Sequence, residues 1–316
     1  MSAIGIIINA KSDRNAGLVD DLLYVTKRAK SSVRTVVLDG IKGLDKALIE
    51  MNRGGVETLV LAGGDGTMQA TFTDTINNDR FNRAPRYVAL PCGMTNVIAT
   101  DCGLPGSPAS SLDSFLWRHD KGSVKTLQRP LLSARNGTKD PVHGFFIGGG
   151  AFYSAVKFSR ESVQSMGAKR KTALALSVGS FVLKTALDQK NSVDDIEIEY
   201  LNNSENVSGA TPSQLVFMAT TLSKLGAGIF PFWGQGEGGM AVTSIDFPAK
   251  RILRAAPAMI RAKSRSWFDE YGYRSWRSDQ LMMKTDGPFV FDGEFFEPDT
   301  SAPTILETSN RAEFLQ

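Results

Sequence analysis

The chain has 316 residues, of which 42% are hydrophobic and 22% are charged, and this composition excludes intrinsic disorder as its main state. The 36 lysines and arginines nearly balance the 33 aspartates and glutamates, and the resulting net charge of +3 is too small to indicate a nucleic-acid partner. The two cysteines, Cys92 and Cys102, exclude a disulfide scaffold and a zinc site of the Cys-x-x-Cys type. We therefore expect free thiols, no nucleic acid and a location in a reducing cytoplasm.

The first third of the chain alternates between strand-like and helix-like segments. Runs rich in β-branched residues, each bounded by Gly, Asn or Pro, predict buried strands at 4–8, 33–38, 56–61 and 87–90. Apolar spacing predicts helices between them, at 18–30, 44–52 and 67–77. Since parallel neighbours need a crossover helix, this alternation predicts a doubly wound parallel sheet. Ligands of such sheets bind beyond the carboxyl ends of the strands, here near Asn9, Gly63 and Pro91.

Beyond about residue 121 the pattern becomes mainly strand-like. Strands are predicted at 124–135, 142–147, 195–201, 214–220, 240–247, 289–296 and 304–307, and helices at 172–187 and 249–263. The stretch 172–187 contains Lys184 and falls short of the roughly 20 residues that a membrane span needs, so no span is expected. We predict a nucleotide-binding α/β domain at 1–122 and a mostly antiparallel β-sandwich domain for the acceptor at 123–316, whose last residues could return to the first domain.

The strongest chemical motif is the glycine-rich loop Gly63-Gly64-Asp65-Gly66-Thr67, directly after a predicted strand. Three glycines in four positions let the backbone turn sharply and approach phosphate oxygens, and Thr67 can cap the helix that follows. Asp65 would repel a bare phosphate unless Mg²⁺ or a ribose hydroxyl lies between them. The loop therefore predicts a nucleotide with a metal ion, the alternative being a tight turn in which Asp65 only bonds backbone.

This loop resembles the nucleotide motif of the diacylglycerol kinase catalytic family, lipid kinases that include bacterial diacylglycerol kinases and the sphingosine and ceramide kinases. NAD kinases share the motif, and phosphofructokinases have a variant of it. Further stretches resemble the lipid kinases in the family's order: 8–15 its Asn-Pro-Lys-Ser-Gly loop, 90–96 its Pro-x-Gly-Thr-x-Asn-Asp loop, 226–242 its glycine cluster, and 291–294 its Asp-Gly-Glu motif.

The resemblance implies an ATP site, a Mg²⁺ site and a catalytic acid pair. The residues expected to bind ATP are Asn9, Gly63, Gly64, Asp65, Gly66, Thr67, Gly93, Thr95 and Asn96. Asp65 and Glu237 are expected to supply oxygens to Mg²⁺, directly or through water. Asp292 would accept the proton of the acceptor hydroxyl, and Glu294, predicted on the same strand face, would orient it or join the metal network. The alternative for this pair is a solvated hairpin tip, because Asp-Gly is a common turn dipeptide.

The function expected from these motifs is an ATP-dependent lipid kinase that phosphorylates a hydroxyl of a diacylglycerol-like or sphingoid-like lipid. Two alternatives stay open, an NAD kinase-like enzyme and a nucleotide-binding regulatory protein with little turnover. The second alternative arises because Met94 and Val97 stand where the family has threonine and aspartate, and neither side chain can replace those contacts.

The segment 247–278 suggests how a lipid would be reached. It contains eight lysines and arginines against Asp269 and Glu270, interleaved with five aromatic residues: Trp267, Phe268, Tyr271, Tyr273 and Trp276. Cations beside aromatic rings suit an anionic bilayer surface, so we predict peripheral contact at the inner membrane surface. The alternative is a charged helix and loop with the rings packed inward. A homodimer is left open.

Overall fold

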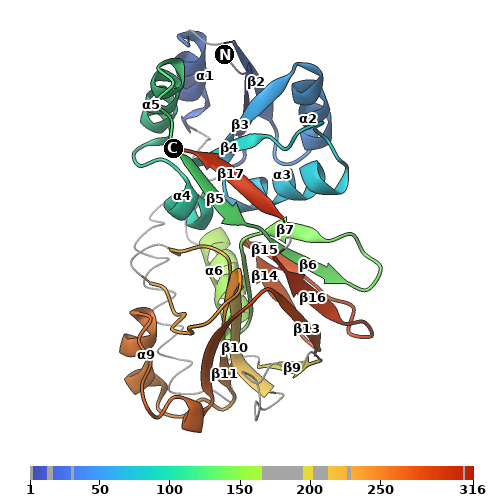
Figure 1. Ribbon diagram of the computed structural model, residues 1–316, viewed down its shortest axis with the longest axis vertical. Helices are drawn as coiled ribbons and strands as arrows, with labels where there is room; N and C mark the ends of the chain where they lie inside the picture. The colour runs from blue at the N-terminus through green and yellow to red at the C-terminus, as the bar shows by residue number, and fades with distance from the viewer. Residues whose placement is uncertain are drawn as a thin grey trace.

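The computed structural model describes residues 3–12, 17–29, 32–165, 195–201, 213–225, 229–308 and 310–316. Two sheets lie one above the other along the longest axis of the molecule (Figure 1). The upper sheet is flanked by helices, and the lower one is antiparallel and curled. The predicted fold class is therefore confirmed, while the helix expected at 172–187 lies outside the described residues.

The upper sheet has the strand order β2-β1-β3-β4-β17-β5. Its first four strands are parallel: β1 (Ala3–Asn9), β2 (Val33–Leu38), β3 (Val56–Gly63) and β4 (Arg86–Pro91). The helices that connect and cover them are α1 (Val19–Lys27), α2 (Leu44–Arg53), α3 (Asp65–Asn77), α4 (Val97–Cys102) and α5 (Pro108–Asp120). The four predicted strands and the three predicted helices are all present, whereas α4 and α5 were not predicted.

Burial on both faces explains why these strands are almost continuously apolar. Ile7 and Leu59 pack with residues of α2 and α3 on one face, while Ile6 and Val60 pack with residues of α1 and α5 on the other. All four side chains are fully buried. A central parallel strand covered on both sides has no solvent face, so its sequence shows no polar alternation.

The last described strand, β17 (Arg311–Leu315), completes the upper sheet. It lies between β4, to which it is parallel, and β5 (Thr126–Pro130), to which it is antiparallel. Phe314 and Leu315 are fully buried, and the Phe314 ring contacts those of Phe72, Tyr87 and Phe145. The aromatic cluster thus joins segments from both ends of the chain.

The lower sheet follows the order β15-β14-β8-β10-β9-β13-β16-β6-β7, with β11 and β12 branching from β10. Its strands are β6 (Leu132–Asn136), β7 (Val142–Gly144), β8 (Phe146–Gly150), β9 (Ile196–Tyr200), β10 (Ser213–Thr220), β11 (Met240–Asp246), β12 (Tyr273–Ser278), β13 (Gln280–Thr285), β14 (Phe289–Phe291), β15 (Glu294–Phe296) and β16 (Thr304–Glu307). Helix α6 (Ala151–Ser165) follows β8, and α9 (Ile252–Ile260) follows β11. The strand expected at 124–135 is wrong as a single element, because the chain leaves the upper sheet after β5 and enters the lower sheet with β6.

A buried histidine connects α3 with the lower sheet. His143 of β7 has its Nδ1 atom 2.7 Å from Ser133 Oγ of β6 and its Nε2 atom 3.0 Å from Asn77 Oδ1 of α3. Because the Asn77 amide nitrogen donates to the Pro141 carbonyl, Asn77 Oδ1 accepts from Nε2–H and the Ser133 hydroxyl donates to Nδ1. Burial lowers the pKa of His143 to about 4, so the ring is neutral near pH 7.

This network predicts a pH-dependent stability. In the unfolded chain the histidine binds a proton near its ordinary pKa of 6.5, whereas in the folded protein it stays neutral down to about pH 4. The free energy of unfolding should therefore fall as the pH drops through this interval. Urea unfolding at a series of pH values should show a steeper fall for the wild-type protein than for His143→Gln. The variant of the other histidine, His119→Gln, keeps His143 and should retain the fall that His143 causes, and equal slopes in wild type and His143→Gln would contradict the assignment.

Candidate functional site

Three loops meet at the carboxyl ends of β1, β3 and β4, as expected for a doubly wound sheet. Asn9 at the end of β1 donates from its amide to Thr67 Oγ1, 2.8 Å away, in the first turn of α3. Ser12, in the same loop as Asn9, donates to the Cys92 carbonyl after β4 at 3.0 Å. The predicted nucleotide-binding residues after the three strands are thus brought together.

The loops after β3 and β4 touch through their backbones. A Cβ atom on Gly93 would lie 2.6 Å from the Cα atom of Gly64, which is closer than real Cβ contacts. Gly64 is the N-cap of α3, and its carbonyl accepts the amides of Thr67 and Met68. Glycine is therefore required at position 93, whereas a Cβ atom at Gly64 would be 3.3 Å from the Gly93 Cα atom and would need only a small shift. A glycine N-cap adds no side chain at the start of this long helix, where an anionic ligand can bind.

Asp65 begins α3 and holds the next loop in place. Its Oδ2 atom accepts the Thr95 hydroxyl at 2.7 Å and the Val97 amide at 3.1 Å, and its Oδ1 atom accepts the Ile98 amide at 3.0 Å. The carboxyl group thereby caps α4, and its burial raises its pKa. Asp65 therefore accepts hydrogen bonds from backbone amides, as the alternative to metal binding predicted. These amides belong to the segment after β4 and not to the turn that contains Asp65.

Thr95 and Asn96 shape the loop after β4 from within. The Thr95 hydroxyl bonds to Asp65, and Asn96 bonds to both backbone groups of Gly93, accepting its amide at 2.6 Å and donating to its carbonyl at 2.8 Å. Asn96 has a left-handed backbone conformation with φ of 52°, which asparagine tolerates better than most residues. Both side chains are thus used to fix the loop, whereas the sequence predicted that they line the phosphates.

Asp292 lies in a tight turn, not in a continuous strand. Phe291 of β14 pairs with Glu294 of β15, so Asp292 and Gly293 form a two-residue hairpin loop with φ values of 45° and 87°. The expectation that Asp292 and Glu294 lie on one face of one strand is therefore wrong, because Asp-Gly favours a turn in which both residues have positive φ. The hairpin tip is also not solvated at Asp292, which is only 4% exposed.

The Asp292 carboxylate is held by the lower domain. Its Oδ2 atom accepts the Phe145 amide at 2.8 Å and its Oδ1 atom accepts the Phe146 amide at 3.0 Å. Burial raises its pKa well above the ordinary value, and the negative charge of Asp65 raises it further. The fold therefore brings a buried carboxyl group from each domain close enough for the two charges to interact.

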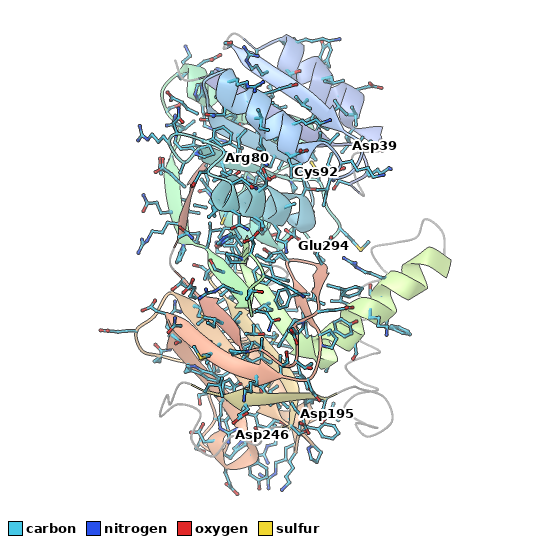
Figure 2. The ribbon with its side chains drawn as sticks, turned by 90° about the vertical axis from the view of Figure 1, so that its right-hand side faces the viewer. Asp39, Arg80, Cys92, Asp195, Asp246 and Glu294 are labelled. Carbon is cyan, nitrogen blue, oxygen red and sulfur yellow. The ribbon has the colours of Figure 1, made fainter. Side chains whose placement is uncertain are left out.

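Glu294 lies against the first turn of α3, where the two domains meet (Figure 2). A Cβ atom on Gly66 would be 2.5 Å from Glu294 Oε1. The Glu294 side chain is 49% exposed and forms an ion pair of 3.4 Å with Arg160 of α6. Arg160 also donates to the Gly293 carbonyl, and its guanidinium lies 4.7 Å from the centre of the Phe295 ring. Arg160 thus clamps the hairpin that carries both predicted catalytic acids.

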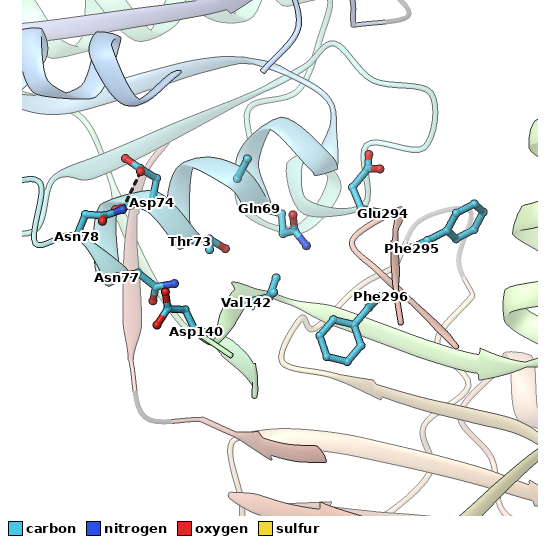
Figure 3. Close-up of a pocket in the computed structure, with 11 residues that line it drawn as sticks. Gln69, Thr73, Asp74, Asn77, Asn78, Asp140, Val142, Glu294, Phe295 and Phe296 are labelled. Carbon is cyan, nitrogen blue, oxygen red and sulfur yellow. Dashed lines mark hydrogen bonds between the residues drawn. The ribbon is translucent and has the colours of Figure 1, made fainter. Parts of the chain in front are cut away.

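A cavity of about 440 Å³ lies beside Glu294, between α3, β7 and β15 (Figure 3). The α3 side is polar, with Gln69, Thr73 and Asn77 among its lining residues. Phe295 and Phe296 of β15 also line it; the Phe296 ring faces the cavity, whereas the Phe295 ring points toward Tyr153 and Arg160 of α6 (Figure 3). The cavity therefore combines hydrogen-bonding groups with an apolar wall.

Residues 3–127 match the family model of the diacylglycerol kinase catalytic domain. This part of the chain is therefore similar to the catalytic domain of the diacylglycerol kinases. The match contains the three loops at β1, β3 and β4, and it ends before the Asp292 hairpin. The likeness thus lies in the first domain. None of the curated proteins matches the chain by sequence.

Solved structures extend the likeness of this kinase domain to the whole chain. Two structures of a provisionally named diacylglycerol kinase from Bacillus anthracis strain Sterne have TM-scores of 0.65 and 0.66 with this chain at 12% identity. A third, named a diacylglycerol kinase from the same organism, has a TM-score of 0.59 at 12% identity. Each comparison covers 99% of this chain and 96% of the other. At this identity the likeness shows that the two-domain fold is shared.

A kinase of this family implies ATP and a divalent cation, so the residues around α3 should offer oxygen atoms that can bind such a cation. Within the described ranges, no group of three or more His, Cys, Asp or Glu residues is placed to hold a metal ion. Mg²⁺ usually keeps several waters and takes further oxygens from nucleotide phosphates, so two carboxyl groups are enough protein ligands. The buried pair Asp65 and Asp292 fits this need, because a cation between them would offset the charge that raises the pKa of Asp292.

Glu237 is placed differently from the other predicted metal ligand of the kinase. It is exposed in the loop before β11, next to Gly238 and Gly239, whose backbones pack against Ser278 and Thr308. Among the described residues, the hydrogen-bond partners of the Asp65 carboxyl group are Thr95, Val97 and Ile98, and none of them neighbours Glu237 in the chain. The structure therefore does not bring these two carboxylates into contact.

Two features of the site were missed by sequence reasoning. Arg160 meets Glu294 across 134 positions of the chain, and Gly144 leaves room for Asp292 because a Cβ atom there would overlap the Asp292 carboxylate. Neither residue stands in a motif. Only the fold shows that α6 and the end of β7 reach the hairpin.

Proposed function

We propose that the protein is an ATP-dependent lipid kinase, which transfers the γ-phosphate of ATP to a hydroxyl of a lipid. The observation that carries this proposal is the meeting of the Asp292–Glu294 hairpin with the start of α3, which puts carboxylates from the second domain beside the glycine-rich loop of the first. The match of residues 3–127 to a lipid kinase family supports the same reaction.

The nucleotide phosphates bind, in this proposal, at the N-terminus of α3. Gly63, Gly64 and Gly66 add no side chains of their own to this turn, and Asn9 fixes Thr67 in the first turn. Gly93 lets the loop after β4 lie directly against Gly64. Mg²⁺ near Asp65 would reduce the negative charge between the phosphates and the carboxylates.

Glu294 is the better placed proton acceptor of the two acids. Both oxygens of Asp292 already accept backbone amides and its side chain is buried, whereas Glu294 is half-exposed and borders the cavity. In the proposed reaction the acceptor hydroxyl gives its proton to Glu294 while its oxygen attacks the γ-phosphorus. The bond between the γ-phosphorus and the bridging oxygen breaks, and ADP leaves. Asp292 holds the hairpin in position, in place of the proton-accepting role that the sequence suggested.

Apolar side chains near Glu294 support a lipid as the acceptor. Phe295 is 40% exposed and lines the cavity, and Met94, next to Thr95, is 37% exposed. A thioether cannot bind phosphate, yet it packs well against a flexible hydrocarbon chain. We propose that Met94 contacts the acceptor, which is diacylglycerol-like or sphingoid-like. No helix in the described ranges has the length and apolar character to span a membrane. Peripheral contact with a membrane through 247–278 is part of the proposal.

A labelling assay tests the function. The purified protein is incubated with Mg²⁺, γ-labelled ATP and detergent-dispersed diacylglycerols, monoacylglycerols, sphingoid bases or ceramides, with NAD in a separate tube. Transfer of label to a lipid that is lost without Mg²⁺ and strongly reduced in Glu294→Gln is expected. Label in NAD alone would replace the proposal by an NAD kinase, and ATP binding without any labelled product would favour a regulatory protein.

A further inference from the structure

Helix α9 is apolar on two opposite faces. One face packs into the lower domain, where Ala255, Ala258 and Met259 are buried with Phe268 and Tyr273. On the other face Leu253 is 56% exposed, Ile260 is 42% exposed and Pro257 is also exposed. At 3.6 residues per turn, positions 253, 257 and 260 fall on one line along the helix. An amphipathic surface helix would carry polar residues at these positions.

A neighbouring loop extends this exposed apolar line. The Phe230 amide donates to the Ile260 carbonyl at 3.2 Å, which brings Ile229, 43% exposed, to the C-terminal end of α9. We call Ile229, Leu253, Pro257 and Ile260 the α9 ridge. The ridge lies at the outer edge of the lower domain, where α9 is the outermost labelled helix (Figure 1).

The charges around the ridge are mostly positive. Exposed cations follow and flank α9, namely Arg251, Arg254, Arg261, Lys263 and Arg265. Of the acids nearest in sequence, Asp246 before α9 forms an ion pair with Arg274, and Asp269 and Glu270 lie in the short helix that follows α9. Arg251 lies over the Tyr271 ring at 4.3 Å. An apolar line bordered by cations is complementary to a surface whose headgroups are anionic and whose interior is hydrocarbon.

The aromatic residues of 247–278 do not form this surface. Phe268, Tyr273 and Trp276 are buried, and Trp267 and Tyr271 are half-buried beneath arginines. The alternative of inward-packed rings is thus correct for three of the five. The exposed apolar groups of this region are the aliphatic ones on α9, which the composition of the segment did not single out.

We infer that the α9 ridge is the surface by which the protein docks onto an anionic lipid bilayer. The helix has nine residues, about 14 Å at 1.5 Å per residue, so it lies along the interface with Leu253 and Ile260 below the headgroups. The flanking arginines and lysines bind the anionic headgroups. This inference rests on the proposed function, because a lipid acceptor resides in a bilayer. Binding to a bilayer is nevertheless measured without any phosphate transfer.

Vesicle sedimentation tests the inference on the full chain. Vesicles of phosphatidylcholine are compared with vesicles that also contain phosphatidylglycerol. The wild-type protein is expected to bind the anionic vesicles, and the double variant Leu253→Glu, Ile260→Glu to bind them at least tenfold more weakly. Ile41→Glu is the matched control, because Ile41 is 48% exposed on the first domain, and its binding should equal that of the wild type. Lys263→Glu with Arg265→Glu should weaken binding to anionic vesicles.

The other outcomes contradict the inference in distinct ways. Equal binding of the ridge variant and the wild type would remove α9 from the contact, and equal binding to both kinds of vesicle would remove the role of charge. Self-association of the wild type that the ridge variant abolishes, without vesicle binding, would assign the ridge to a second copy of the chain. The ridge variant should keep its turnover on a short-chain lipid in detergent. Vesicle binding by a protein that phosphorylates no lipid would reject the proposed function and leave the docking surface standing.

Discussion

Replacing Glu294 by glutamine is expected to lower the rate of phosphate transfer roughly 10²–10⁴-fold, the usual contribution of a general base. The substitution keeps the shape of the side chain but removes its ability to take a proton. Because Glu294 is half-exposed, the free energy of unfolding should change little, and binding of ATP should persist. Single-turnover transfer from labelled ATP measures the chemical step directly.

The matched control is Glu297→Gln. Glu297 is exposed just after β15, three positions from Glu294 on the same segment, and it should transfer phosphate at the wild-type rate. A Glu294→Gln variant that is as fast as Glu297→Gln would exclude Glu294 as the proton acceptor. A variant that fails to bind ATP would show instead that Glu294 acts in nucleotide binding.

Asp292→Asn distinguishes the two acids further. An asparagine can accept one of the two amides of Phe145 and Phe146 but turns its NH₂ group toward the other, which costs about 1–3 kcal/mol of stability.

The raised pKa of Asp292 also predicts how stability depends on pH. The folded protein binds the Asp292 proton above the ordinary pKa of 3.8, so its stability falls as the pH rises from that value through the raised pKa. Asp292→Asn should lose this dependence in urea unfolding, and an unchanged dependence would contradict the assignment.

The second large effect is expected at Gly144, where alanine should both destabilise the protein and impair transfer. The added methyl group would overlap the Asp292 carboxylate and the Phe291 ring, so the hairpin must shift. Overpacking of this kind typically costs about 1–3 kcal/mol. Because Glu294 lies in the same hairpin, its displacement from α3 should also reduce the transfer rate. Chemical unfolding and single-turnover kinetics measure the two effects.

Gly17→Ala is the control for Gly144→Ala. An added Cβ atom at Gly17 meets nothing within 4 Å, so neither stability nor transfer should decrease. If Gly144→Ala were equally harmless, the Asp292 carboxylate could not lie against Gly144 in the way described. Loss of stability with full transfer activity would separate the buried carboxyl from catalysis.

The parallel strands of the first domain are predictable because their environment is uniform. Ile6 and Val60 are buried on a sheet covered by helices on both faces, so a continuous apolar run suffices to identify such strands. The break between β5 and β6 is different, because it depends on β17 arriving from the end of the chain. Helix α6 was also not predicted. It follows Gly148 and Gly149, and glycines suggest a loop. Here they belong to strand β8, where the side chains of Phe152 and Phe289 leave no room for a Cβ atom.

The candidate site was predictable as a set of motifs but not as an arrangement. The glycine-rich motif predicts that Asp65 lies in a phosphate-binding loop, yet its bonds to Thr95 and Ile98 depend on how β3 and β4 are aligned. The same holds for Asp292, whose Asp-Gly sequence indicates a turn, while its burial depends on β7 and β8. Contacts between side chains of two different domains produce no local pattern in the sequence.

The position of β17 between β4 and β5 affects how the protein can be made. During synthesis the upper sheet cannot close until residues 311–315 have left the ribosome, after every strand of the lower sheet. Until then β4 has an unpaired edge, and the cluster of Phe72, Tyr87 and Phe145 lacks the Phe314 ring. An open apolar edge of this kind promotes aggregation. The segment that matches the family model, residues 3–127, is therefore not expected to fold when it is expressed alone.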